Sequence, residues 1–265
     1  MDIILLLKTI IMGLVEGATE FLPISSTGHL IITGDVLGFL TKEKRDVFEI
    51  VIQLGAILAV VWQYREKFTH VALSLSETKS QQFVVNLFIA FLPLAIIGLA
   101  FHHQIKALLF NPKSVAIALI VGGFIILWIE KKLPKVTIHE VDDMNWKHAL
   151  KVGFAQAIAL IPGASRAGST IIGGMLFGLS RTVATEFSFF LAVPVMFAAT
   201  AYDLYKSRDL LAANDLLIFF IGFVTAFIAA LIVIRVLIRY VQNHDFTVFA
   251  WYRIIFGGLV LFYYW

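Results

Sequence analysis

No cysteine occurs among the 265 residues of this chain. Disulfides, thiolate nucleophiles and Cys-ligated metals are therefore excluded, and any chemistry must come from carboxylate, imidazole and hydroxyl groups. Charge is scarce as well, because Asp, Glu, Lys and Arg make up 15% of the residues while 60% are hydrophobic. The net charge of +3 is too small to indicate a nucleic-acid partner. This composition is that of an integral membrane protein.

Long runs without any charged residue indicate spanning helices. Residues 83–101 and 216–234 are such runs, and neither shows the alternation typical of barrel strands. Residues 1–15 lead into a polar stretch without a small-residue cleavage site, so we expect them to belong to the mature fold.

The most informative stretch is residues 16–29, which read EGATEFLPISSTGH inside an otherwise apolar sequence. Ionisable groups at bilayer depth cost at least a few kcal/mol, so they are by default candidates for a functional site. The apolar arms on either side, about 3–15 and 28–40, are too short to cross a hydrocarbon core of about 30 Å. We therefore expect a re-entrant hairpin that breaks at Pro23 and whose next helix is capped by the serines that follow.

The stretch has a counterpart in the second half of the chain, in residues 153–172. An offset of 140 aligns Gly13 with Gly153, Ser25 with Ser165, Gly28 with Gly168 and Gly34 with Gly174. Chance similarity between apolar segments is the alternative explanation. A duplication predicts two repeats, about 1–135 and 145–265, within a single transmembrane domain spanning residues 1–265.

Each repeat is expected to hold one hairpin and three spans. The predicted spans lie near 48–64, 83–101 and 114–130 in the first repeat, and near 186–203, 216–238 and 248–265 in the second. The arms of the second hairpin lie near 148–161 and 168–179. An odd number of crossings inverts the second repeat relative to the first, which brings the two hairpins together near the midplane. The predicted fold is therefore an all-α polytopic membrane protein built from two inverted-topology repeats.

The first hairpin is acidic. Glu16 and Glu20 are four residues apart and share one helix face, where two carboxylates repel unless a cation or a proton lies between them. Their oxygens suit a divalent cation, Mg²⁺ or Ca²⁺, which would bridge them to a substrate phosphate. A protonated pair with a purely structural role is the alternative.

The second hairpin is basic, because Arg166 stands where the first has Ser26. An arginine binds phosphate oxygens with a bidentate fork, although a salt bridge from Arg166 to Glu16 or Glu20 is an alternative that need not exclude substrate. The helix starts after both turns also present free backbone N–H groups to an anion. The residues expected to bind substrate are Ser25, Thr27, Gly163, Ser165, Arg166, Ser169 and Thr170.

The expected catalytic residues are Glu20, Ser26, His29 and Arg166. Ser26 and His29 lie three residues apart at a helix start, so the imidazole could take the Ser26 proton or attack phosphorus itself. The sequence leaves the choice of nucleophile open, with Ser26 slightly favoured.

Residues 16–29, together with residues 162–170 (PGASRAGST), resemble the signature motifs of the bacitracin-resistance type undecaprenyl-diphosphate phosphatases. The resemblance covers the whole chain. It implies hydrolysis of undecaprenyl diphosphate to the monophosphate and phosphate in a bacterial plasma membrane, with the site facing the outer side. It places Glu16 and Glu20 on the paired acidic positions, Ser26 and His29 on the hydroxyl and imidazole positions, and Arg166 on the phosphate-binding position. Ala167 departs from the pattern, because family members commonly carry Ser there.

Other functions remain to be weighed against this one. Inverted repeats with broken helices are also typical of transporters, so a carrier or flippase for lipid-linked phosphate is the main alternative. An ion-coupled carrier would use the two glutamates but would leave Arg166 unexplained. Membrane lipid is the expected surrounding, and the sequence leaves a homodimer open. Lysines at 131, 132, 135, 147 and 151 mark that connection as the cytoplasmic one.

Overall fold

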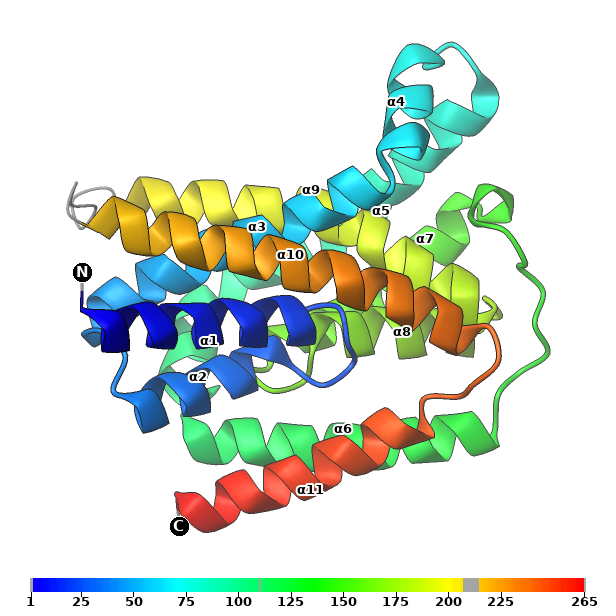
Figure 1. Cartoon of the computed structure of the whole chain (residues 1–265). Coiled ribbons are helices and arrows are strands. Elements are labelled where there is room, and N and C mark those ends of the chain that lie inside the picture. Colours follow the sequence, from blue (N-terminus) through cyan, green and yellow to red (C-terminus); the bar gives the residue numbers. More distant parts are fainter. Residues whose placement is uncertain (1, 110, 207–214, 265) are drawn as a thin grey trace.

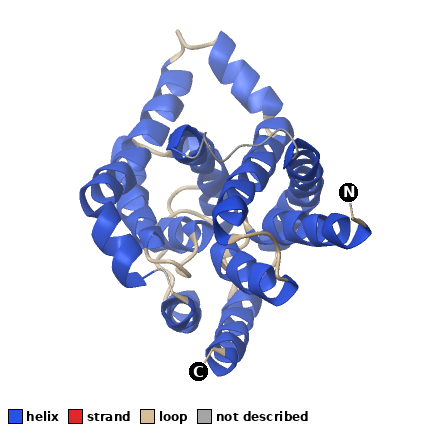
Figure 2. Ribbon diagram, turned by 90° about the vertical axis from the view of Figure 1, so that its left-hand side faces the viewer, coloured by secondary structure: helices blue, strands red, loops and turns tan. Residues whose placement is uncertain are grey.

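The computed structural model describes residues 2–109, 111–206 and 215–264 (Figure 1). Within these ranges the chain is helical, and extended backbone pairs at one isolated bridge between Ile138 and Leu179 (Figure 2). The α-helices are α1 Ile3–Thr19, α2 Ser26–Leu37, α3 Lys42–Gln63, α4 Arg65–Leu73, α5 Thr78–Leu109, α6 Pro112–Lys131, α7 Trp146–Ala157, α8 Arg166–Leu176, α9 Arg181–Lys206, α10 Leu216–Val241 and α11 Thr247–Tyr263. Two short 3₁₀ helices, η1 Val141–Asp143 and η2 Ile158–Leu160, lie in the connections.

Five of the described helices are long and apolar enough to cross a membrane, namely α3, α5, α6, α9 and α10. The prediction of an all-α polytopic membrane protein is therefore confirmed. The sixth predicted span, 248–265, corresponds to α11, which has 17 residues. At a rise of about 1.5 Å per residue, this helix is slightly shorter than the hydrocarbon core.

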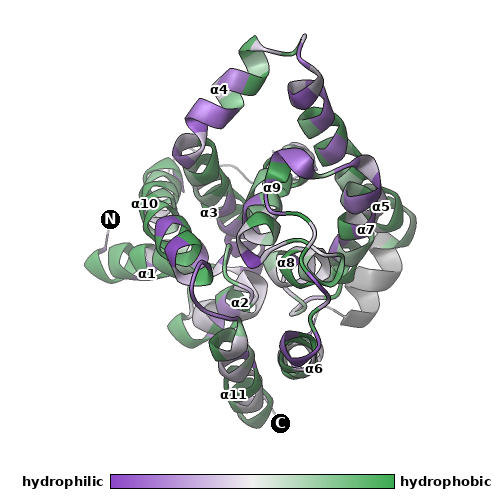
Figure 3. Ribbon diagram, turned by 90° about the vertical axis from the view of Figure 1, so that its right-hand side faces the viewer, coloured by the Kyte–Doolittle hydropathy of each residue, from purple (hydrophilic) through white to green (hydrophobic). Residues whose placement is uncertain are grey.

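Helix α4 is not among the predicted elements. The chain turns at Tyr64 and forms a further helix that extends away from the other helices in Figure 1, with α5 returning beside it. Figure 3 shows hydrophilic colour along much of α4, whereas α1 is mostly hydrophobic. Helix α4 has nine residues and only a few apolar side chains, such as Phe68 and Val71, so it forms no long apolar run and the sequence predicts no element here.

The two halves of the chain are interlocked, because helices of each half pack on helices of the other. Helix α1 packs on α10, α7 packs on α5, and α6 packs on α11. Close approach explains part of this pattern, because a Cβ added at Gly13 would lie 2.7 Å from the carbonyl oxygen of Gly222 and one at Gly153 would lie 2.6 Å from that of Ala90. Small residues at a helix interface let backbones approach in this way in membranes. The first hairpin, α1–α2, is thus held by a long helix from the other half, and the second, α7–α8, is held in the same manner.

The turns of the two hairpins share one feature of local geometry, a capping serine with a positive φ. Helix α1 ends before Pro23, as predicted, and Ser25 and Ser165 both have a φ of +72°. Each serine caps its helix, with the Ser25 Oγ accepting a hydrogen bond from Gly28 N at 3.5 Å and the Ser165 Oγ from Gly168 N at 3.0 Å. Ser25 and Ser165, which the offset of 140 aligns, therefore play the same role as helix caps.

Candidate active site

The turns of the two hairpins meet inside the helical bundle. In Figure 1 the α1–α2 hairpin comes from the side of the N-terminus and the α7–α8 hairpin from the opposite side. Contact between the turns is direct, because the Ser165 Oγ donates a hydrogen bond to the Leu22 carbonyl oxygen at 3.4 Å. The structure thus brings together the two polar stretches, which lie in different halves of the sequence.

At this junction Glu20, Ser26 and Arg166 form one cluster. The Arg166 Nη2 donates to the Glu20 Oε1 at 2.9 Å, and the Ser26 hydroxyl donates to the other carboxylate oxygen, Oε2. The Glu20 side chain is 6% exposed and the Arg166 side chain 11%. Removing one partner of such a buried pair leaves an uncompensated charge, which costs about 3–5 kcal/mol. The salt bridge from Arg166 to Glu20, one of the alternatives drawn from the sequence, is therefore present.

Arg166 is also held by helix α9. Its Nη1 donates to the Ser188 carbonyl oxygen at 3.0 Å, and the guanidinium carbon lies 5.7 Å from the centroid of the Phe21 ring. The Thr170 and Ser188 hydroxyls lie 2.6 Å apart and so support the same region. The Nε of Arg166 is buried and finds no hydrogen-bond acceptor among the described residues. One donor of the fork is therefore free for a ligand.

Glu16, one turn before Glu20, has a different environment. It is 1% exposed, and neither of its carboxylate oxygens has a hydrogen-bond partner in the described part of the chain. A buried carboxylate without donors fits a bound cation. Within the same part of the chain, three or more acidic or His side chains do not gather at any point.

The His29 ring nitrogens bond to Ser25 and Tyr252, and the Ser26 hydroxyl bonds to Glu20, so the described residues show no hydrogen bond for the predicted proton transfer from Ser26 to His29. The His29 Nδ1 donates to the Ser25 carbonyl oxygen at 2.7 Å, which leaves Nε2 as the acceptor for the Tyr252 hydroxyl, also at 2.7 Å. The ring also stacks on Phe256, with centroids 4.1 Å apart. The imidazole therefore bonds to and stacks on side chains of α11. The acceptor that the Ser26 hydroxyl contacts is Glu20.

The remaining predicted residues are divided between the junction and its surroundings. The Ser25 and Ser165 side chains serve as helix caps, and Gly163 supplies a turn with a φ of +92°. Thr27 is exposed, whereas the cluster itself is buried. Ser169 donates to the Ser165 carbonyl oxygen at 2.8 Å and lines a neighbouring cavity.

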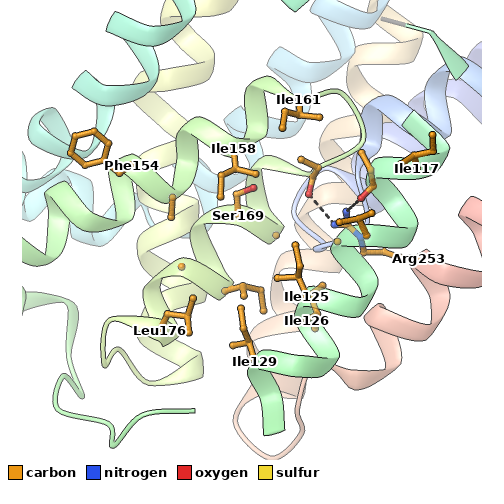
Figure 4. A pocket seen from close by; sticks show the side chains of 18 of the residues that line it. Ile117, Ile125, Ile126, Ile129, Phe154, Ile158, Ile161, Ser169, Leu176 and Arg253 are labelled. Atoms are coloured by element: carbon orange, nitrogen blue, oxygen red, sulfur yellow. Dashed lines mark hydrogen bonds between the residues drawn. The ribbon is translucent and has the colours of Figure 1, made fainter. Parts of the chain in front are cut away.

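That cavity is a large apolar space beside the site. It has a volume of about 760 Å³ and lies between α6, α7 and α8. Figure 4 shows side chains such as Ile125, Ile129 and Phe154 around it, with Ser169 among them and Arg253 at one end. An elongated apolar group could therefore lie close to the turn of the second hairpin.

Sequence reasoning missed Arg253 and its neighbour Tyr252. Arg253 is 1% exposed, and its guanidinium donates hydrogen bonds to backbone carbonyls of both hairpin turns. A signal was present, since Arg253 is the lone charged residue of the otherwise apolar stretch 248–265. An ionisable residue at such a position is a functional candidate by default.

Comparisons with known proteins identify a family and several similar proteins. The family model described as bacitracin resistance protein BacA matches residues 9–259. A protein of Nitrosospira multiformis named undecaprenyl-diphosphatase is 62% identical over 262 residues, covering 98% of this chain and 96% of that protein. Proteins with the same name from Nitrosomonas europaea and Dechloromonas aromatica are 60% and 61% identical, each covering 98% of this chain and 95% of theirs. The chain therefore belongs to the BacA family of bacitracin resistance proteins.

Proposed function

We propose that this chain hydrolyses undecaprenyl diphosphate to undecaprenyl phosphate and inorganic phosphate. The activity would recycle the lipid carrier of cell-wall synthesis and confer resistance to bacitracin. The name shared by its relatives over nearly their full length supports this function. The observation that carries it is the cluster of Glu20, Ser26 and Arg166, in which a hydroxyl, a proton acceptor and an anion-binding fork lie together.

In the reaction we propose, Ser26 is the nucleophile. Its oxygen attacks the terminal phosphorus while its proton passes to Glu20, and the bond from phosphorus to the bridging oxygen breaks. Undecaprenyl phosphate leaves and takes the proton back from Glu20, so the carboxylate is free to accept a proton from the water that attacks the phosphoserine. Glu20 then returns this proton to the Ser26 oxygen as phosphate is released. This assignment replaces His29 by Glu20 as the base, because the Ser26 hydroxyl already donates to that carboxylate.

Arg166 would stabilise the charge that develops on the phosphoryl oxygens. Its free Nε is the donor available for this purpose, and its other nitrogens are already fixed by Glu20 and Ser188. Donors that are fixed before the reaction lower the barrier because they need no reorganisation in the transition state. The backbone N–H groups at the start of α2 and α8 would add to this anion site.

A divalent cation, Mg²⁺ or Ca²⁺, would be held by Glu16, with Glu20 next to it. Glu20 already offsets the charge of Arg166, so the charge of a diphosphate calls for a further cation. When bound, such an ion would neutralise phosphate oxygens. The free oxygens of Glu16 support this role.

The prenyl chain would lie in the apolar cavity between α6, α7 and α8. The cavity adjoins Ser169 and Ala164 of the second hairpin, so a lipid with its head at the junction would place its tail there. This location agrees with a substrate that arrives from the bilayer.

The finer architecture is also part of the proposal. Two inverted repeats would explain why Ser25 and Ser165 share one conformation, and why α1 packs on α10 while α7 packs on α5. Each hairpin would then be re-entrant. The lysines of the 131–151 connection support a cytoplasmic location for it in a bacterial plasma membrane, and both termini and the access to the site would then lie on the outer side.

Release of phosphate by the purified protein tests the function. We expect the wild type in detergent to release one phosphate per undecaprenyl diphosphate and Ser26→Ala to release almost none. A transporter of lipid-linked phosphate would instead leave the substrate intact in detergent and move it across vesicle membranes. Intact substrate after prolonged incubation with folded wild-type protein would refute the phosphatase assignment.

A further inference from the structure

Arg253 makes an unusual set of contacts for a buried charge. Its Nε donates to the Leu119 carbonyl oxygen at 3.2 Å, its Nη1 to those of Pro23 and Ala164 at 3.0 Å each, and its Nη2 to those of Ala118 and Gly163 at 3.1 and 3.0 Å. All five acceptors are backbone oxygens. The five N–H groups of a guanidinium are thus matched by five carbonyls.

The five carbonyls belong to three segments that lie far apart in the sequence. Pro23 is in the turn between Glu20 and Ser26, whereas Gly163 and Ala164 come directly before the helix that begins with Arg166. Ala118 and Leu119 belong to α6. One rigid, planar group therefore fixes the two hairpin turns relative to each other and to a spanning helix.

A glycine on α6, Gly122, makes room for the Arg253 guanidinium. A Cβ added at Gly122 would overlap the Arg253 guanidinium at Nη2 and would lie 2.7 Å from its Cζ. Glycine at position 122 is therefore needed for the guanidinium to reach the carbonyls of the preceding turn.

We propose that Arg253 is a positioning residue that sets the separation between the Glu20–Ser26 pair and Arg166. It acts through the backbone, because its hydrogen bonds to the described residues go to carbonyls and its contact with each turn lies two or three residues from a member of the cluster. The inference rests on the proposed function in so far as the cluster is the catalytic one. A misplacement of about 1 Å at a reacting group can cost on the order of 100-fold in rate.

The test compares two perturbing variants with one matched control. Arg253→Lys keeps the charge but offers three donors from a single nitrogen, so it cannot span the same carbonyls. Gly122→Ala keeps the arginine and pushes a methyl group against it. Gly258→Ala on α11 is the control, because an added Cβ there meets no atom within 4 Å.

Two measurements are made on each folded protein, namely the kinetics of phosphate release and hydrogen exchange of backbone amides. We expect kcat to fall on the order of 100-fold in Arg253→Lys and Gly122→Ala while KM changes little, because the anion-binding groups remain. Exchange should accelerate in residues 20–27 and 160–167 and stay unchanged in α10. The control should match the wild type in both measurements.

Three results would overturn the inference. These are a wild-type kcat in both folded variants, faster exchange in α10 as well as in the turns, and the failure of both variants to fold. In the second and third cases Arg253 would stabilise the whole fold rather than position the site. The exchange data do not depend on activity. A wild type without phosphatase activity would refute the proposed function, and hydrogen exchange would still test whether Arg253 fixes the two hairpin turns.

Discussion

Replacing Arg166 by lysine is the sharpest test of the proposed chemistry, because it separates the charge of the side chain from its geometry. The Arg166 guanidinium reaches Glu20 with Nη2 and the Ser188 carbonyl oxygen with Nη1, while its Nε stays free for substrate. A lysine ammonium is a single point and cannot serve all three positions. The variant keeps the charge opposite Glu20 but loses at least the donor aimed at the phosphate.

The expected magnitude follows from these contacts. Loss of one fixed donor to a transition-state oxyanion costs about 3 kcal/mol, or on the order of 100- to 1,000-fold in kcat. The cost in stability should be smaller, about 1 kcal/mol for the bond to Ser188, because Glu20 retains a cationic partner. Arg166→Met would be less informative, since it leaves Glu20 buried without a counter-charge and costs about 3–5 kcal/mol.

The assay is phosphate release from undecaprenyl diphosphate by detergent-purified protein, with thermal unfolding measured on the same samples. Arg235→Lys is the matched control, because Arg235 is exposed and bonds Gln63 rather than the site. A folded Arg166→Lys protein with a kcat within about threefold of the wild type would show that charge alone suffices. It would refute the role of the several guanidinium donors in catalysis.

Three further outcomes are expected. Glu16→Gln should abolish the response of phosphate release to chelator titration, whereas an unchanged response would place the cation elsewhere. Ile125→Trp narrows the apolar cavity and should raise KM about tenfold for undecaprenyl diphosphate but not for farnesyl diphosphate. Phe124→Trp, at an exposed position outside the cavity, is the control. Equal effects on both substrates would exclude the cavity as the site of the prenyl tail. Single cysteines at positions 43 and 140 should react with an impermeant reagent from opposite sides of the membrane, and labelling of both in intact cells would contradict inverted repeats.

The positions of the polar stretches could be predicted from the sequence because they interrupt long apolar runs. The break at Pro23 and the serine cap at Ser25 follow from backbone chemistry, and the structure confirms them. The offset of 140 predicts that the two hairpins lie opposite each other, and contact between them through Arg166 and Glu20 is what the structure shows.

The individual partners could not be predicted in the same way. His29 lies three residues from Ser26, but the helix directs its ring toward Tyr252, which belongs to the last helix of the chain. Spacing defines which face of a helix a residue occupies, whereas the neighbour on that face depends on tertiary packing. Arg253 was missed for a related reason, because its partners are backbone carbonyls, which carry no signal in the sequence.

The interlocked packing of the two halves has a consequence for biosynthesis. Helix α1 packs on α10, and Gly17 lies against Ala226, which is translated much later. At a synthesis rate of about 5–20 residues per second, the delay between these two positions is on the order of 10 to 40 s. During that time the first hairpin lacks its packing helix, and for the earlier part of it also lacks Arg166, so the Glu20 carboxylate must remain hydrated or protonated until the second hairpin has been made. Packing of the first hairpin can therefore be completed only when α10 has left the ribosome.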